Sequence, residues 1–140
     1  MLLQVGVKIF LKNHEGKFLL LERNLEKYPE ISKTEKWDIV GGRINPETPL
    51  MANLEREIFE ETKLVLKSEP RLICAQDIMK PDKHVVRLTY LGQTEGDPQI
   101  DEEHKNFKWF SMDELLAMPD MDKFAKEALG KLQMEFSAQL

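Results

Sequence analysis

The chain has few of the residues and segments that would set it apart from ordinary globular proteins. It has one cysteine, Cys74, among 140 residues, which excludes an internal disulfide framework and fits a reducing compartment. The apolar neighbours in RLICA (71–75) predict a thiol packed in the core rather than a nucleophile. No apolar run approaches the ~18 residues that a membrane span needs, and MLLQVGVKIF lacks the marks of a signal peptide. We therefore expect a cytoplasmic protein that makes no membrane contact.

The chain also has fewer basic than acidic residues. Lys and Arg number 20 against 25 Asp and Glu, which gives a formal net charge of −5. A general attraction to nucleic acid polymers or anionic membranes is therefore not expected. Apolar residues at 41% and charged residues at 32% are typical of a globular protein with a core, and the length suits a single domain over 1–140.

The order of apolar and polar segments predicts a mixed α/β or α+β fold. Apolar runs at 4–12 and 17–23 flank the short turn NHEG, a pattern typical of a β-hairpin. The polar stretch 24–36 predicts a long loop of the kind that often carries function. Further strands are expected at 37–40, 64–66, 71–79, 84–93 and 107–110, and helices at 49–62, 111–118 and from residue 122 onward.

The helix expected at 49–62 has an unusual distribution of charge. At about 100° per residue, Leu50, Leu54 and Ile58 lie on one face, and Glu61 falls on the edge of that face. Glu57 and Glu61 form a like-charge pair at i, i+4, which is unfavourable. Burying part of a carboxylate without a counter-charge lowers stability or raises its pKa. The helix therefore breaks local rules in a way that is typical of functional sites.

A divalent cation would compensate for this crowding. Carboxylates from one helical turn converge easily on a hard cation, and Mg²⁺ prefers oxygen ligands while keeping waters for a substrate phosphate. The alternative is a solvated amphipathic helix, which the i, i+4 pair of Arg56 and Glu60 would support. We favour metal binding, since the three glutamates also lie in the half of the helix where its dipole disfavours them.

The segment GRINPETPLMANLEREIFEETKL (42–64) resembles the Nudix box, G-x5-E-x7-R-E-U-x-E-E-x-G-U, where U is a bulky aliphatic residue. Its most specific part, R-E-U-x-E-E, is intact. Two positions depart: Thr48 stands at the isolated acidic position, with Glu47 one residue before it, and Lys63 stands at the second glycine. LLLER and WDIVGG before the helix, and FKWFSMDEL after it, extend the resemblance over most of the chain. The chain is thus similar to the Nudix hydrolase superfamily, in particular to its MutT-like branch.

The resemblance implies a fold, an activity and a cofactor. The fold is an α/β/α sandwich with a mixed β-sheet. The activity is hydrolysis of a nucleoside diphosphate linked to another group, with Mg²⁺ or Mn²⁺ lowering the pKa of the attacking water. A (d)NTP or related small nucleotide is the expected substrate, because the chain is short and lacks an N-terminal extension. The alternative substrates are a nucleotide sugar and ADP-ribose. The alternative function is a nucleotide-binding module with weak or no turnover. The expected state is a monomer or homodimer.

The resemblance also gives each matching residue of the box a role. Glu57 and Glu61 look like the principal metal ligands, and Glu60 resembles a further ligand or the group that orients the attacking water. Arg56 would hold the glutamates by charge-assisted hydrogen bonds. Gly41 and Gly42 would let the backbone and the substrate approach closely.

Other candidates lie outside the box. A glutamate on a later loop often assists the reaction in this family, and here GDPQIDEEHKN offers Glu102 or Glu103. Arg23 matches a position where relatives place a phosphate-contacting basic residue, although an exposed charge at a strand end is the alternative. Trp37 is expected to pack. The three histidines have no metal-ligand spacing and receive no role: His14, His84 and His104. Substrate specificity is expected in the segments 24–36 and 76–84.

The two departures raise questions about the ends of the helix. Thr48 is a chemically sensible N-cap, followed by Pro49 at the first helical position. Lys63 stands where the chain commonly turns through the left-handed conformation. A residue other than glycine costs about 1 kcal/mol there, or the turn takes another form. Ser111 is expected to cap the following helix.

Overall fold

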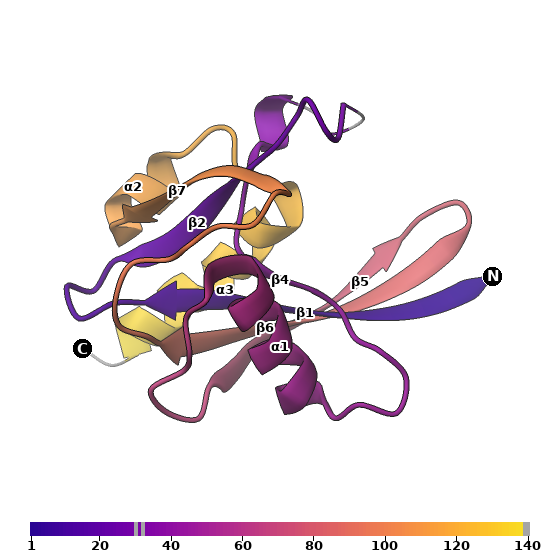
Figure 1. Cartoon of the computed structure of the whole chain (residues 1–140), viewed down its shortest axis with the longest axis horizontal. Helices are drawn as coiled ribbons and strands as arrows, with labels where there is room; N and C mark the ends of the chain where they lie inside the picture. Colours follow the sequence, from indigo (N-terminus) through magenta and orange to yellow (C-terminus); the bar gives the residue numbers. More distant parts are fainter. Residues whose placement is uncertain (30, 32, 139–140) are drawn as a thin grey trace.

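The computed structural model describes residues 1–29, 31 and 33–138, and these form a mixed sheet with helices on both faces (Figure 1). The strands are β1 (Leu2–Lys12), β2 (Phe18–Arg23), β3 (Trp37–Asp38), β4 (Val40–Arg43), β5 (Arg71–Met79), β6 (Lys83–Gln93) and β7 (His104–Phe110). The helices are α1 (Leu50–Thr62), α2 (Met112–Ala117) and α3 (Lys123–Ala138), with a short 3-10 helix at Lys33–Glu35. The expected α+β class is confirmed. In this part of the chain, no helix is long and apolar enough to cross a membrane.

Strand β1 organises the sheet. It pairs in parallel with β6 over its whole length, and β5 extends the sheet antiparallel beyond β6. Its other edge pairs antiparallel with β4 and then, at Lys12, with β2. Strand β2 in turn pairs with β3 and β7. The register sets Gly42 opposite Val7 and Gly41 opposite Lys8, so the glycine pair lies directly beside β1.

The apolar runs of β1 and β2 are continuous because both faces of the sheet are covered. Side chains alternate across the sheet, so Ile9 and Leu11 pack toward α1 while Phe10 packs toward α2 and α3. Figure 1 shows α1 in front of the sheet and α3 behind it. The α1-side cluster also holds Val7, Leu19, Leu21, Val40, Leu54, Ile58, Leu64 and Tyr90. The expected α/β/α sandwich is confirmed.

The segment 64–66 is not a strand, and this expectation was wrong. The chain turns at the end of α1, and Leu64 enters the α1-side cluster with 6% of its surface exposed. The apolar run therefore fills space beside a helix instead of pairing in the sheet. Cys74 is half-buried rather than enclosed, and it packs against the cluster on the α3 side. Burial raises the pKa of its thiol.

The expected N-cap of α1 was also wrong. Pro49 occupies the N-cap position, and no side chain caps it. Asn53, fully buried one turn into the helix, holds the entry instead. Its Oδ1 accepts the Asn45 N–H at 2.9 Å, and its Nδ2 donates to the Thr48 and Pro49 carbonyls at 2.8 and 3.0 Å. Thr48 thus contributes its backbone and not its hydroxyl.

The other helix ends follow the sequence more closely. Lys63 adopts the left-handed conformation, with φ 63°, and its N–H donates to the Phe59 carbonyl at 2.9 Å. The turn expected for glycine therefore forms with a lysine, at a cost of about 1 kcal/mol. Ser111 caps α2 in a reciprocal capping box with Glu114. Trp37 packs edge-on against Phe110, with ring centroids 5.3 Å apart.

Candidate active site

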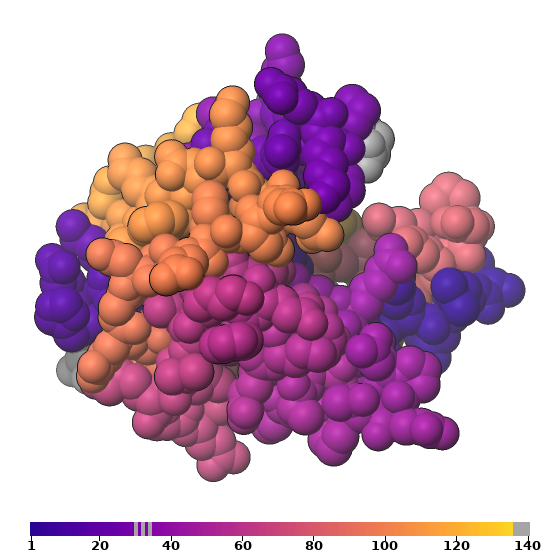
Figure 2. Space-filling view, in the orientation of Figure 1, coloured from indigo at the N-terminus to yellow at the C-terminus, as the bar shows by residue number. Residues whose placement is uncertain are grey.

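A polar cleft of about 560 Å³ lies where the loop after β2, the strand β4, the helix α1 and the chain before β7 meet. Figure 2 shows a hollow here, between the loop that follows β2 at the top and the tip of the β5–β6 hairpin at the right. Eight candidate residues from the sequence line the cleft: Arg23, Gly41, Gly42, Arg56, Glu57, Glu60, Glu61 and Glu103. Glu102 is not among its lining residues, so the structure brings one of the two loop glutamates to the cleft.

Arg56 holds two of the helix glutamates. Its Nη1 donates to Glu60 Oε2 at 3.1 Å, and its Nη2 lies 3.1 Å from Glu57 Oε1. The same Nη2 reaches the Arg43 carbonyl at 3.3 Å and Asn53 Oδ1 at 3.2 Å. The guanidinium therefore connects the helix to the strand that enters it.

Glu61 is the buried member of the set, with 6% of its surface exposed. Its Oε1 accepts the Gly41 N–H at 3.2 Å. Burial raises the pKa of Glu61 to about 8; the charge of Lys8 and the Gly41 hydrogen bond oppose this rise. Burial also raises the pKa of Glu57, and Glu60 adds to that shift while Arg56 opposes it. Two neighbouring carboxyls on α1 therefore resist ionisation without a further cation.

The two glycines of β4 allow neighbouring atoms to approach the strand closely. A β-carbon on Gly42 would lie 2.6 Å from Glu57 Oε2, which is closer than any real contact. Gly41 has φ 146°, and a β-carbon there would lie 2.1 Å from the Val7 carbonyl oxygen. Gly41 is therefore required by the neighbouring strand, whereas a larger residue at Gly42 would displace the Glu57 carboxylate.

A buried ion-pair network forms the floor of the cleft. Asp38 Oδ2 accepts from Lys8 Nζ at 2.9 Å and from Arg23 Nη2 at 2.6 Å. Arg23 Nη2 also donates to Asp122 Oδ1 at 3.0 Å. Burial alone would raise the pKa of Asp38, but the charges of Lys8, Arg23 and Arg87 lower it well below its usual range. Arg23 is therefore a bridge between two acids at the floor of the cleft, and not a free charge at a strand end.

Several of these residues were not identified from the sequence. Lys8 and Asp38 are single charges inside the apolar runs VGVKIFL and WDIV, and a charge buried in a strand needs a partner. That pattern was the signal that could have found them. Asp101 and His104 also line the cleft, with His104 Nδ1 2.7 Å from Asp101 Oδ1. Nothing in the spacing of the histidines indicated this contact.

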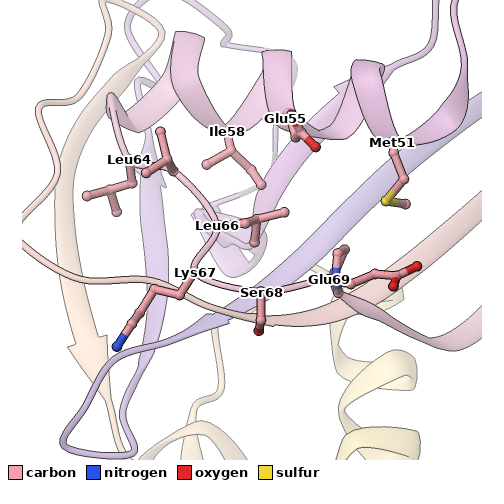
Figure 3. Close-up of a pocket in the computed structure, with 10 residues that line it drawn as sticks. Met51, Glu55, Ile58, Leu64, Leu66, Lys67, Ser68 and Glu69 are labelled. Atoms are coloured by element: carbon pink, nitrogen blue, oxygen red, sulfur yellow. The ribbon is translucent and has the colours of Figure 1, made fainter.

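A groove of about 460 Å³ lies on the other side of α1 (Figure 3). Met51 and Ile58 of the helix face Leu64 and Leu66 of the following segment across it. Its charged side chains, those of Glu55, Lys67 and Glu69, are exposed. This groove is an apolar contact between a helix and the loop after it, without the buried charges of the cleft.

Comparison of the sequence with known protein families identifies the family of this chain. The sequence model of the NUDIX domain matches residues 2–132. The chain belongs to the Nudix family. It is a hydrolase that acts on anhydrides of phosphorus-containing compounds, and MutT-like proteins are among its structural neighbours. No curated protein sequence matches it significantly.

Solved structures of the Nudix fold superpose over nearly the whole chain. The MutT protein from Methanosarcina mazei Go1 gives a TM-score of 0.82 at 24% identity, covering 95% of this chain and 94% of that one. The MutT NUDIX hydrolase from Burkholderia pseudomallei gives 0.75 at 25% identity, with 94% and 98% covered. The NUDIX domain of Shewanella oneidensis NrtR, complexed with ADP ribose, gives 0.77 at 18% identity, with 97% and 90% covered. The fold of the chain is thus shared with these proteins.

Nudix hydrolases generally use divalent metal ions, and the residues of this chain fit such an ion. Glu57, Glu60 and Glu61 offer only carboxylate oxygens, the donors that Mg²⁺ and Mn²⁺ prefer. A cation would also stabilise the charged forms of the two carboxyls whose pKa values burial raises. In the described ranges, no three acidic, histidine or cysteine side chains are grouped around one point. Arg56 contacts Glu57 Oε1 and Glu60 Oε2, and the Gly41 N–H donates to Glu61 Oε1.

Proposed function

We propose that this Nudix hydrolase splits a diphosphate linkage in a small nucleotide, most directly a (d)NTP, with Mg²⁺ or Mn²⁺ held by Glu57, Glu60 and Glu61. The observation that supports this proposal best is the buried carboxyl of Glu61 beside Glu57 at the wall of a polar cleft. Burial without a cation is unfavourable for both carboxylates. A divalent ion held by these carboxylates would remove that penalty.

Different residues of the cleft have different roles in the proposed reaction. The metal would lower the pKa of the attacking water and neutralise charge on the phosphate oxygens. Arg56 keeps Glu57 and Glu60 oriented toward the cleft. Gly42 leaves room for the Glu57 carboxylate at the wall of the cleft. Water attacks one phosphorus, the bridging P–O bond breaks, and the leaving phosphate departs with the electron pair.

A base is needed to take the proton of the attacking water. Glu103 lines the cleft opposite α1 and is our candidate for that role. Glu60 is the alternative, since its carboxylate is the most exposed of the three on the helix, at 57% of its side-chain surface. The variants Glu103→Gln and Glu60→Gln distinguish the two candidates. Replacing the residue that acts as the base should lower kcat with little effect on KM, and should shift the acidic limb of the pH profile.

A substrate panel tests the proposed function. The purified protein is incubated with the (d)NTPs, ADP-ribose and nucleotide sugars, with Mg²⁺, Mn²⁺ or EDTA, and the products are identified. We expect pyrophosphate or phosphate release from at least one nucleotide with a metal and none with EDTA. Turnover that persists in EDTA would contradict the metal site. Tight nucleotide binding by calorimetry without any turnover would identify a binding module instead.

A further inference from the structure

A small basic pocket adjoins the active-site cleft. It measures about 200 Å³ and five cationic side chains line it: Lys8, Arg43, Lys80, Lys83 and Arg87. The remaining lining residues are Gln4, Gly6, Gly42 and Val85, so no acidic side chain is among them. Pockets for whole drug-sized ligands measure about 300–1,000 Å³. This pocket is therefore suited to one small anionic group.

The parallel pairing of β1 and β6 brings these cations together. Gly6 lies opposite Arg87 in the register, and Lys83, Val85 and Arg87 alternate onto one face of the sheet. Lys80 is joined to Lys83 across the tight hairpin turn, where its N–H donates to the Lys83 carbonyl at 2.8 Å. The absent side chain of Gly6 leaves the space between them open. Figure 1 shows this end of β1 and the β5–β6 hairpin extending beyond the helices.

The charges of the pocket are only partly compensated. Lys8 is paired with Asp38. Arg87 Nη1 lies 3.5 Å from Asp122 Oδ2, yet this buried nitrogen has no hydrogen-bond partner. The side chains of three further residues form no ion pair with any residue that the structure describes: Arg43, Lys80 and Lys83. In a chain with a net charge of −5, this is a local site for an anion.

The pocket lies next to the cleft, and three residues line both: Lys8, Gly42 and Arg43. We propose that the basic pocket binds a second phosphate group of the substrate, a phosphomonoester separate from the diphosphate that is cleaved. Lysine and arginine donors would hold it by charge-assisted hydrogen bonds. This inference rests on the proposed cleavage of a diphosphate linkage, and it moves the expected substrate from a simple (d)NTP to a nucleotide that carries a phosphomonoester besides that linkage.

Matched substrate pairs that differ by one phosphomonoester test this inference: dephospho-coenzyme A with coenzyme A, and NADH with NADPH. The wild-type protein should favour the phosphorylated member of at least one pair by about tenfold in kcat/KM, because one charge-assisted hydrogen bond contributes roughly that factor. Lys80→Ala/Lys83→Ala should bring this ratio close to one. The control Lys126→Ala/Lys131→Ala removes two exposed lysines of α3 outside both hollows and should keep the ratio. Ratios near one in the wild type, or ratios that survive in the double pocket variant, would overturn the inference.

A binding measurement separates failure of the pocket from failure of the proposed function. In EDTA, adenosine 3′,5′-bisphosphate should bind about tenfold more tightly than AMP by calorimetry, and this difference should shrink at high salt. Lys80→Ala/Lys83→Ala should abolish the difference, and the α3 control should retain it. If no substrate is hydrolysed, the proposed function fails while this comparison still decides the pocket. Equal binding of the two nucleotides in the wild type contradicts the pocket alone.

Discussion

The two sides of α1 differ in how far charged side chains are exposed to water. On the groove side, Glu55 and Lys67 lie in water beside apolar side chains that pack together. On the cleft side, Glu61 and Asp38 are almost fully buried. An exposed charge costs little, whereas a buried one must be paired, protonated or bound to a cation. The difference separates the side of the helix that stabilises the fold from the side that is under a functional constraint.

The largest effect should come from breaking the buried network at the floor of the cleft. Asp38→Asn leaves Lys8 and Arg23 without their shared counter-charge, and removing one partner of a buried ion pair costs about 3–5 kcal/mol. The matched change on the groove side is Lys67→Met, which breaks the exposed pair with Glu95 and should cost at most about 1 kcal/mol. Urea unfolding measures both. Equal losses for the two variants would show that burial does not distinguish the two sides.

The second prediction concerns turnover. Glu57→Gln should lower kcat/KM with Mg²⁺ by at least about a hundredfold, since even the outer partners of metal ligands contribute about 10–100-fold. Glu55→Gln, on the groove side of the same helix, removes the same charge from an exposed position and should leave kcat/KM within a factor of about two. Steady-state kinetics on the best nucleotide checks this. A similar loss in both variants would point to the charge of the helix rather than to a ligand.

The third prediction is a pH dependence of stability in EDTA. The pKa of Glu61 is about 8 in the folded protein, above its ordinary value of 4.5. The folded state thus binds more protons than the unfolded state between these values, and the contribution of Glu61 to stability falls as pH rises through this window. The melting temperature should therefore fall less between pH 5 and pH 8 in Glu61→Gln than in the wild type. Mg²⁺ should also reduce the fall, because it binds the deprotonated carboxylate. A wild-type fall equal to that of Glu61→Gln would contradict the shifted pKa.

The smallest effect lies at the end of α1, where the two sides meet. Lys63→Gly should stabilise the protein by about 1 kcal/mol, because glycine adopts the left-handed conformation without strain. Lys63→Ala keeps the β-carbon and should give no such gain. Lys63 lines neither the cleft nor the groove, so activity should not change. A loss of stability in Lys63→Gly would show that its contact with the Phe59 ring outweighs the strain.

Local signals were sufficient for much of the fold. The capping box of Ser111 and Glu114 and the glutamates of α1 depend on residues within a few positions of each other, so spacing alone indicated them. The run Leu64–Leu66 had the composition of a strand, but composition cannot distinguish a strand from a segment that packs on a helix. The prediction for the start of α1 was wrong for a similar reason. Thr48 and Asn53 both offer polar side-chain groups, and only the tertiary structure, which buries Asn53, determines that Asn53 makes the hydrogen bonds.

The ion-pair network at the floor of the cleft could not be predicted from local sequence spacing. Lys8 and Asp38 are 30 positions apart, and Arg23 and Asp122 are 99 apart. Only the strand register and the start of α3 bring them together. The choice between Glu102 and Glu103 likewise depended on which one turns into the cleft. The cytoplasmic location and the monomeric or dimeric state stay predictions.

The parallel pairing of β1 with β6 has a consequence for how the chain folds. One whole edge of the first strand, from Leu2 to Lys12, waits for Lys83–Gln93 before it can pair. Such long-range pairing must overcome a large loop-closure entropy, which slows folding. A growing or truncated chain that ends before residue 83 presents an apolar strand edge ready to pair with another molecule. The strand that organises the finished sheet thus stays without its most extensive pairing until residues 83–93 have been made.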